Sequence, residues 1–145
     1  MMSEIIARLR QEVMPPFGLV EGVAEFAALS APPPRHLLPA AYVMPGGSRP
    51  GPNTLATGLR QRVEETIQIV LLSSSLRDAR GEAATLALDE LYRQLRAALV
   101  GFVPRPAWEP LLLGPARPLP FEDGVVAWAE TYTSAWLLRA ERSEG

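Results

Sequence analysis

The stretch from Arg60 to Phe102 constrains this chain most, because its apolar residues change from a period of two to a helical period within one segment. In its first part apolar and polar residues alternate, with Val63, Ile67, Ile69 and Leu71 on one side and Arg62, Glu64, Thr66 and Gln68 on the other. Such alternation predicts a strand with one buried face. Glu65 interrupts the apolar side, so we expect a bend or a bulge there, or the end of the buried part of the strand.

A helical pattern follows after Ser73 to Ser75, which predict a turn. Its apolar residues form one continuous stripe, which consists of Ala84, Leu88, Leu91, Leu95, Ala98, Leu99 and Phe102. Asp78 is placed to cap the start of this helix, and Gly101 offers a left-handed end before Pro104. A strand followed by an amphipathic helix needs a sheet on which the helix can lie, so this pair is predicted to form the core.

Shorter elements are predicted around this core. They are a first helix capped by Ser3 and ended by Pro15-Pro16, an extended piece at 19–20, helical turns over 23–29, and strands over 40–44, 111–113 and 125–139. The order predicts an α+β fold, with a mainly antiparallel sheet of about four strands. The long helix and the short N-terminal helix are expected to pack on one face of it. Residues 1–145 are expected to form a single domain.

The segment from Pro45 to Gly58 is the main candidate for function. It has three prolines and four glycines in fourteen residues, which predicts an irregular connection. A connection of this length within a domain is usually functional or disordered. No acidic residue lies between Glu25 and Glu64, whereas four arginines do: Arg35, Arg49, Arg60 and Arg62. A loop with only positive charge can meet phosphates or an acidic partner, or can simply be solvated.

Composition argues against several classes of function. Sixteen acidic and fourteen basic residues give a net charge of −2, which provides no general electrostatic attraction to nucleic acid or to an anionic membrane. The absence of cysteine excludes disulfides and thiolate chemistry. No apolar run approaches the ~20 residues of a membrane span, and the N-terminal residues do not form a signal peptide. We therefore expect a soluble protein made in the cytoplasm.

Catalytic groups are few. His36 is the only histidine, and no serine lies in a nucleophile-elbow context. There is no Walker loop, no EF-hand spacing and no dinucleotide-binding pattern, so we expect no cofactor and no metal. Trp128 and Trp136 lie on the last predicted strand. If that strand is at an edge of the sheet, it can pair with another chain.

The order of several short sequences resembles that of a known family. These are Pro-Ala-Ala-Tyr-Val-Met-Pro at 39–45, the Gly/Pro/Asn-rich loop, Thr-Gly-Leu-Arg-Gln-Arg-Val at 57–63, Arg-Asp-Ala-Arg-Gly-Glu-Ala-Ala at 77–84, Leu-Asp-Glu-Leu at 88–91 and Asp-Gly-Val-Val-Ala-Trp at 123–128. Together they resemble the tail terminator family of long-tailed bacteriophages and prophages. None of them is a catalytic motif.

The resemblance implies a structural, non-enzymatic virion protein made in the bacterial host cytoplasm. Members of the family form a ring, a hexamer, at the head-proximal end of the tail tube. The ring stops polymerisation of the tube protein and offers the surface for the head-tail connector protein, while DNA passes through its lumen without sequence-specific binding. Our hypothesis for this chain places subunit and partner contacts at Arg49, Asn53, Arg60, Arg62, Trp128 and Trp136.

Three other functions remain open. The nearest is another neck component, such as a head-completion or stopper protein. A small-molecule-binding α+β domain is the second, and it predicts a monomer with an apolar pocket. An enzyme that uses His36 as a general base is the third.

Overall fold

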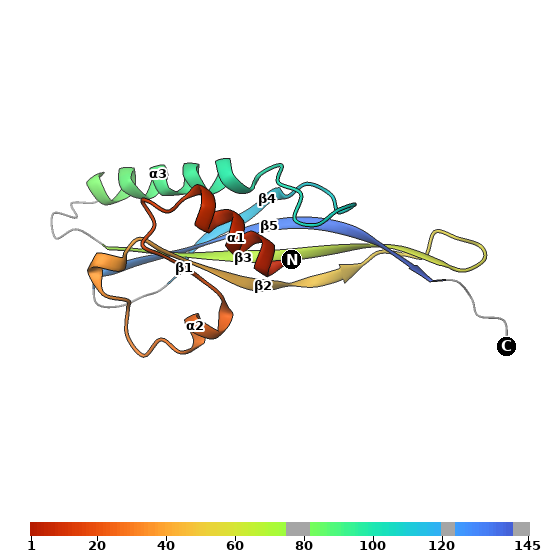
Figure 1. The fold of residues 1–145 in the computed structure, drawn as a ribbon, viewed down its shortest axis with the longest axis horizontal. Coiled ribbons are helices and arrows are strands. Elements are labelled where there is room, and N and C mark those ends of the chain that lie inside the picture. The colour runs from red at the N-terminus through yellow and green to blue at the C-terminus, as the bar shows by residue number, and fades with distance from the viewer. Residues whose placement is uncertain (75–81, 120–123, 141–145) are drawn as a thin grey trace.

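A computed structural model describes residues 1–74, 82–119 and 124–140, and side chains except those of 82–87. The described strands form one mixed sheet in the order β1-β2-β3-β5-β4 (Figure 1). They are β1 (Leu19–Glu21), β2 (Ala40–Pro50), β3 (Leu59–Ser74), β4 (Leu112–Leu119) and β5 (Val125–Ala140). The helices are α1 (Met2–Glu12), α2 (Val23–Ala27), a short 3-10 helix (Arg35–Leu37) and α3 (Glu82–Leu99). The α+β prediction is confirmed, but the sheet has five strands rather than four, and β1 runs parallel to β2.

The central strand is β3, which pairs along its whole length of 16 residues with β5 and on its other side with β2. The irregularity expected at Glu65 is not in β3, which keeps an unbroken register with β5. It lies in the neighbouring strand, where the register of β2 shifts between Pro45 and Gly47. Gly47 has a φ of 111°, which suits this bulge because glycine adopts positive φ freely.

One face of the sheet carries the larger core, beneath α1 and α3. The predicted helical stripe is confirmed from Leu88 onward, since Leu91, Leu95, Ala98 and Leu99 are buried against β3. The side chain of Ala84 lies outside the described residues. Gly101 ends the helix with a φ of 86°, as expected. Asp78 and Ser75 fall outside the described residues. Ser73 and Ser74 continue β3 instead of forming a turn.

The other face is also covered, which corrects the expectation of helices on one face only. Tyr42, Val70 and Leu72 are buried there, and α2 with the segment that follows it lies over them (Figure 1). The ring of Phe26 in α2 meets the ring of Tyr42 edge-on, with centroids 5.2 Å apart. The unbroken apolar run at 69–72 is the sequence signal for this second face, because a strand buried on both faces loses its alternation.

Residues 45–50 were expected to be irregular and instead form the end of β2. Pro45 and Pro50 stand opposite Ile67 and Val63. The amide of Gly51 donates to the carbonyl of Arg62 at 2.7 Å, so the even-numbered residues of β3 bond to β2 and the odd-numbered ones do not. The nitrogens of both prolines therefore point away from the sheet, where a missing N–H costs nothing.

Three smaller expectations also need correction. Helix α1 begins at Met2 and has no side-chain cap; the hydroxyl of Ser3 donates to Glu4. The strand expected at 111–113 is longer and begins at Leu112. The last strand, β5, is not an edge strand, because it lies between β3 and β4.

Candidate assembly surface

Three strands continue beyond the body of the molecule and form a narrow projection, which we call the arm: residues 45–67 and 134–140. It arises because β1 pairs with β2 only as far as Tyr42, and β4 pairs with β5 only between Ala127 and Thr133. In Figure 1 the arm extends away from the helices and ends in the 51–58 turn.

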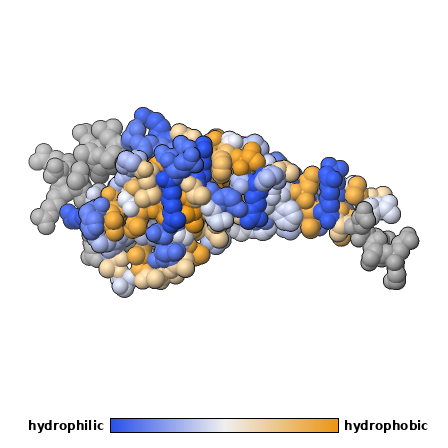
Figure 2. Space-filling view, in the orientation of Figure 1, coloured by the Kyte–Doolittle hydropathy of each residue, from blue (hydrophilic) through white to orange (hydrophobic). Residues whose placement is uncertain are grey.

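The arm leaves large apolar side chains in solvent. Leu55, Leu59, Leu137 and Leu138 are 42, 46, 43 and 38% exposed. On the face shown in Figure 2, hydrophobic surface alternates with hydrophilic side chains along this narrow end. Clustered exposed leucines on a part of the sheet that no helix covers are typical of a surface that contacts another protein.

Asn53 organises the turn at the tip of the arm. Its carboxamide oxygen accepts from the amides of Arg60 (2.9 Å) and Leu55 (3.2 Å). Its carboxamide nitrogen donates to the carbonyls of Gly58 (3.1 Å) and Leu55 (3.2 Å). The polar atoms of Asn53 are therefore engaged within the turn, and its role as a contact residue stays a prediction.

Arg62 is bound within its own chain. Its guanidinium donates to both carboxylate oxygens of Glu109, at 2.6 and 2.9 Å, and to Glu64 at 2.9 Å. These hydrogen bonds, that of Glu109 first, raise the pKa of Arg62, and the same contact lowers the pKa of Glu109. The amide of Glu109 also donates to the carbonyl of Ala135 at 2.8 Å, so this residue fastens its loop to the margin of β5.

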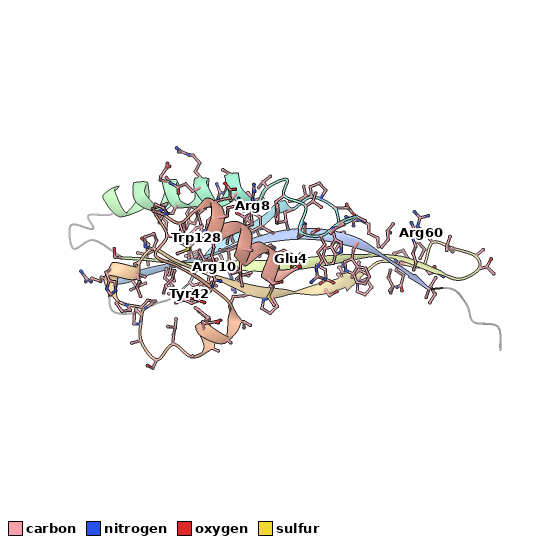
Figure 3. The ribbon with its side chains drawn as sticks, viewed as in Figure 1. Glu4, Arg8, Arg10, Tyr42, Arg60 and Trp128 are labelled. Carbon is pink, nitrogen blue, oxygen red and sulfur yellow. The ribbon has the colours of Figure 1, made fainter. Side chains whose placement is uncertain are left out.

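The other arginines of the arm make no ion pair with any residue that the structure describes. Arg49 stands opposite Glu64, and Arg60 stands directly opposite Arg139 across β3 and β5. Opposite residues of an antiparallel pair share one face of the sheet, with Cβ atoms about 5 Å apart. Arg60 and Arg139 therefore place two like charges side by side at the exposed end of the arm, where Figure 3 labels Arg60.

Trp136 lies at the base of the arm. Its side chain points to the opposite face of the sheet from those of Arg60 and Arg139. Its ring stacks on Trp108 with centroids 5.9 Å apart, and its indole N–H donates to Glu65 at 3.0 Å. Glu65 also accepts from the hydroxyl of Ser48 at 3.0 Å. These residues line an open hollow of about 470 Å³ together with Met1, Met2 and Arg105. Glu65, Ser48 and Trp136 are thus bound to one another, and Arg105 donates to Glu4 at 2.9 Å, as in a structural junction.

Trp128 is in the body, beneath α3 and far from Arg60 (Figure 3). Its ring meets that of Tyr92 with centroids 5.3 Å apart, and both rings line a second hollow of about 560 Å³. Beside them, buried Glu130 accepts two hydrogen bonds from Arg96, at 2.6 and 3.1 Å, and one from Tyr132 at 2.8 Å. Burial, together with the nearby Glu130 charge, raises the pKa of Tyr92 and of Tyr132. Trp128 thus belongs to the core, not to the arm.

The six predicted contact residues therefore do not form one site. The structure brings Arg49, Asn53, Arg60 and Arg62 together on the arm, places Trp136 at its base and leaves Trp128 in the body. Arg139, Leu137 and Glu109 also belong to this surface and were not identified from the sequence. The alternation of 125–139 predicted a strand, but nothing in it gave the register that sets Arg139 against Arg60.

Other functional groups are sparse among the described residues. His36 is exposed on the 3-10 helix and lines neither hollow. No group of three or more metal-ligating side chains comes together in residues 1–74, 82–119 and 124–140. In the same residues, no helix has the length and the apolar character that are needed to cross a membrane.

Comparisons with known proteins agree with this architecture. A chain of a solved structure described as the virion of a native gene transfer agent particle has the same fold, with a TM-score of 0.55 over 93% of this chain and 92% of that chain. The two are 17% identical, so this likeness concerns the fold alone. No curated protein matches the sequence. The family described as phage tail terminator protein matches residues 2–143, so the chain belongs to the phage tail terminator family and is a structural component of a phage tail or neck.

Proposed function

We propose that this chain, acting as a single domain over residues 1–145, forms a ring, a hexamer, at the head-proximal end of the tail tube. The ring stops further addition of tube subunits and offers the docking surface for the head-tail connector protein. DNA passes through its lumen without being read. The function needs no bond to be made or broken, only surfaces that fit neighbouring proteins.

The observation that supports this proposal best is the arm. It projects from a body that has its own core on both faces of the sheet, and Ile67 at its base is the one arm residue among the described members of that core. It exposes four leucines and three arginines without ion pairs among the described residues: Leu55, Leu59, Leu137, Leu138, Arg49, Arg60 and Arg139. A partner that covers these leucines removes apolar surface from water, and arginine forks can make paired hydrogen bonds to its carboxylates.

The hydrogen bonds of the arm indicate that its surface is preorganised for such contacts. Asn53 holds the turn, while Arg62 and Glu109 connect the arm to the loop behind it. A surface fixed before it meets its partner loses less conformational entropy on binding. Asn53 and Arg62 are therefore proposed to position the surface, and Arg49 and Arg60 to contact the partner.

The proposal can be tested in a virus or prophage that carries this gene. Residues 52–57 are replaced by a two-residue Asn-Gly turn, which shortens the tip and leaves β2 and β3 intact. The variant is expected to fold, as measured by circular dichroism and thermal unfolding. It should nevertheless fail to cap tails, so that electron micrographs show overlong tubes and free heads.

An Arg35→Gln variant is the matched control, because Arg35 is exposed on the 3-10 helix, which precedes the end of β2 remote from the 51–58 turn. It should give tails of normal length joined to heads. Tails of normal length in the shortened-tip variant would contradict the proposed role of the arm. Native mass spectrometry of the protein with and without tail tubes tests the ring and its stoichiometry.

The competing function is that of another neck component, such as a head-completion or stopper protein. It predicts that the purified protein binds the connector and not the end of the tail tube. Sedimentation of the protein with purified tubes and, separately, with purified connectors distinguishes the two functions.

A further inference from the structure

We propose that the outer edge of β5 beyond Ala135 binds an extended acidic segment of another virion protein by strand addition. The inference rests on the proposed function in one respect, since it takes that protein to be the tail tube or the connector. It adds the site on this chain, the mode of recognition and the chemistry of the partner segment.

The backbone of β5 defines the site. The carbonyl of Ala135 accepts a hydrogen bond from the amide of Glu109, so the backbone N–H and C=O of Ala135 point away from β3. Backbone groups alternate in direction along a strand, which makes Leu137 and Arg139 the next two outward positions. β4 pairs with β5 no further than Thr133, and no described residue pairs with 136–140 on this side. Within residues 1–74, 82–119 and 124–140, nothing occupies the outward N–H and C=O groups of these two residues.

The other edges of the sheet have outward positions that cannot pair, although Ser48 in β2 and Leu113 in β4 keep outward N–H groups. The outward carbonyl of Val20 in β1 is occupied by the Nε of Arg10 at 3.0 Å. Along the free part of β2, the outward nitrogens at Pro45 and Pro50 have no hydrogen to donate. In β4, Arg117 is paired with Ala129, which has the same outward orientation as Ala135, so the nitrogen of Pro118 also faces away from β5. Prolines on edge strands hinder pairing with other chains, and β5 contains no proline.

The charge beside this edge indicates the partner. Arg60 and Arg139 are opposite each other, and like charges in this arrangement destabilise a sheet unless an anion lies near them. Two copies of the chain joined edge to edge through β5 would bring four such arginines together, which disfavours a second copy as the occupant. A segment whose carboxylates reach the two guanidinium groups relieves the repulsion.

The apolar groups favour protein over nucleic acid. Leu137 and Leu138 point to opposite faces of the strand, and both are exposed. An added strand covers both with alternate side chains, whereas a phosphate backbone leaves them in water. The net charge of −2 also provides no general attraction to DNA. In strand addition, main-chain hydrogen bonds supply affinity and side chains supply specificity.

Site-specific photo-crosslinking tests the inference directly. A photoreactive amino acid is placed at position 137, or at position 48 as the matched control, since Ser48 is exposed on the proline-protected edge of β2. The probes are the tail tubes and connectors of the virus that carries this gene. The expected result is a crosslink from 137 to an extended acidic segment of the tube or connector protein, and none to that segment from 48.

Substitutions measure what the edge contributes. Leu137→Pro removes an outward N–H without affecting the pairing of β5 with β3, and Leu137→Val is the control that keeps the amide. Binding to tubes or connectors should weaken at least tenfold in the proline variant, and by less than about threefold in the valine variant. The double substitution Arg60→Gln and Arg139→Gln should weaken binding further and reduce the salt dependence of binding. Arg139→Pro tests the same edge if Leu137→Pro does not fold.

The outcomes separate this inference from the proposed function. A crosslink from 137 to another copy of the chain, or to DNA, overturns the inference. So does the absence of any crosslink from 137 when the protein caps tails normally, and the proposed function then stands. If position 137 crosslinks to an acidic segment but loss of the protein has no effect on tail capping, the inference is supported and the proposed function is contradicted.

Discussion

Arg62 and Glu109 are joined by two hydrogen bonds of 2.6 and 2.9 Å although they are 47 positions apart in the chain. Glu109 reaches Arg62 from the margin of β5, where its own amide holds Ala135. This pair links the loop that carries Trp108 to the arm. Both side chains are about half exposed, so the contribution of the pair is positional more than energetic.

The first prediction concerns the acid dependence of this link. Arg62 lowers the pKa of Glu109 in the folded protein, so the contact contributes stability above the ordinary carboxyl range. That contribution is lost as the pH falls through the lowered pKa. A carboxyl titration followed by NMR should place the midpoint of Glu109 below the ordinary range of a glutamate, and Arg62→Gln should return it to that range. An unchanged midpoint in Arg62→Gln would contradict the assignment.

The second prediction concerns the turn at the tip of the arm. Asn53→Ala removes four hydrogen bonds of 2.9 to 3.2 Å, two of which hold the amides of Leu55 and Arg60. Because the turn is exposed, the free energy of unfolding should fall by only about 1 kcal/mol. Hydrogen exchange at the amide of Arg60 should accelerate much more. Thr57→Ala, in the same turn, is the control and should change neither quantity; equal exchange in both variants would refute the structural role of Asn53.

The third prediction concerns the charge pair beneath α3. Glu130 is 1% exposed and the side chain of Arg96 is 44% exposed, so the two halves of the pair are not equivalent. Arg96→Met leaves a buried carboxylate without its cation and should lower the free energy of unfolding by about 3 kcal/mol. Glu130→Gln leaves a guanidinium that can reach water and should cost about 1 kcal/mol. Chemical denaturation measures both, and equal losses would show that Glu130 is not effectively buried.

Periodicity predicted the main elements because burial determines it. The stripe from Leu88 to Phe102 and the alternation from Val63 to Leu71 both face the larger core, and both were identified from sequence. The second covered face was missed because its residues form the continuous run at 69–72, which has no period. Tertiary arrangement decided the rest: pairing across strands placed Arg139 beside Arg60, and the start of β4 at Leu112, opposite Thr133, left the arm uncovered.

The strand 45–50 was missed for a different reason. Prolines and glycines argue against a strand interior, and that argument holds for a strand paired on both sides. β2 is paired on one side only beyond Tyr42, and the bulge at Pro45/Gly47 shifts its alternation so that Pro50 also points outward. Sequence alone does not reveal which strand lies at an edge, so it does not reveal where a proline is tolerated.

The last prediction follows from this placement of prolines. Pro50→Thr and Pro118→Thr each restore an outward N–H on an exposed edge and leave the existing ladder unchanged. The free energy of unfolding should therefore change by no more than about 1 kcal/mol, chiefly through the unfolded chain. Self-association should nevertheless increase, since an edge that can donate is a template for another strand. Light scattering over a concentration series measures the association, with Pro52→Thr, in the turn outside the strands, as the control. Association of both edge variants no greater than that of Pro52→Thr would mean that these prolines do not protect the sheet.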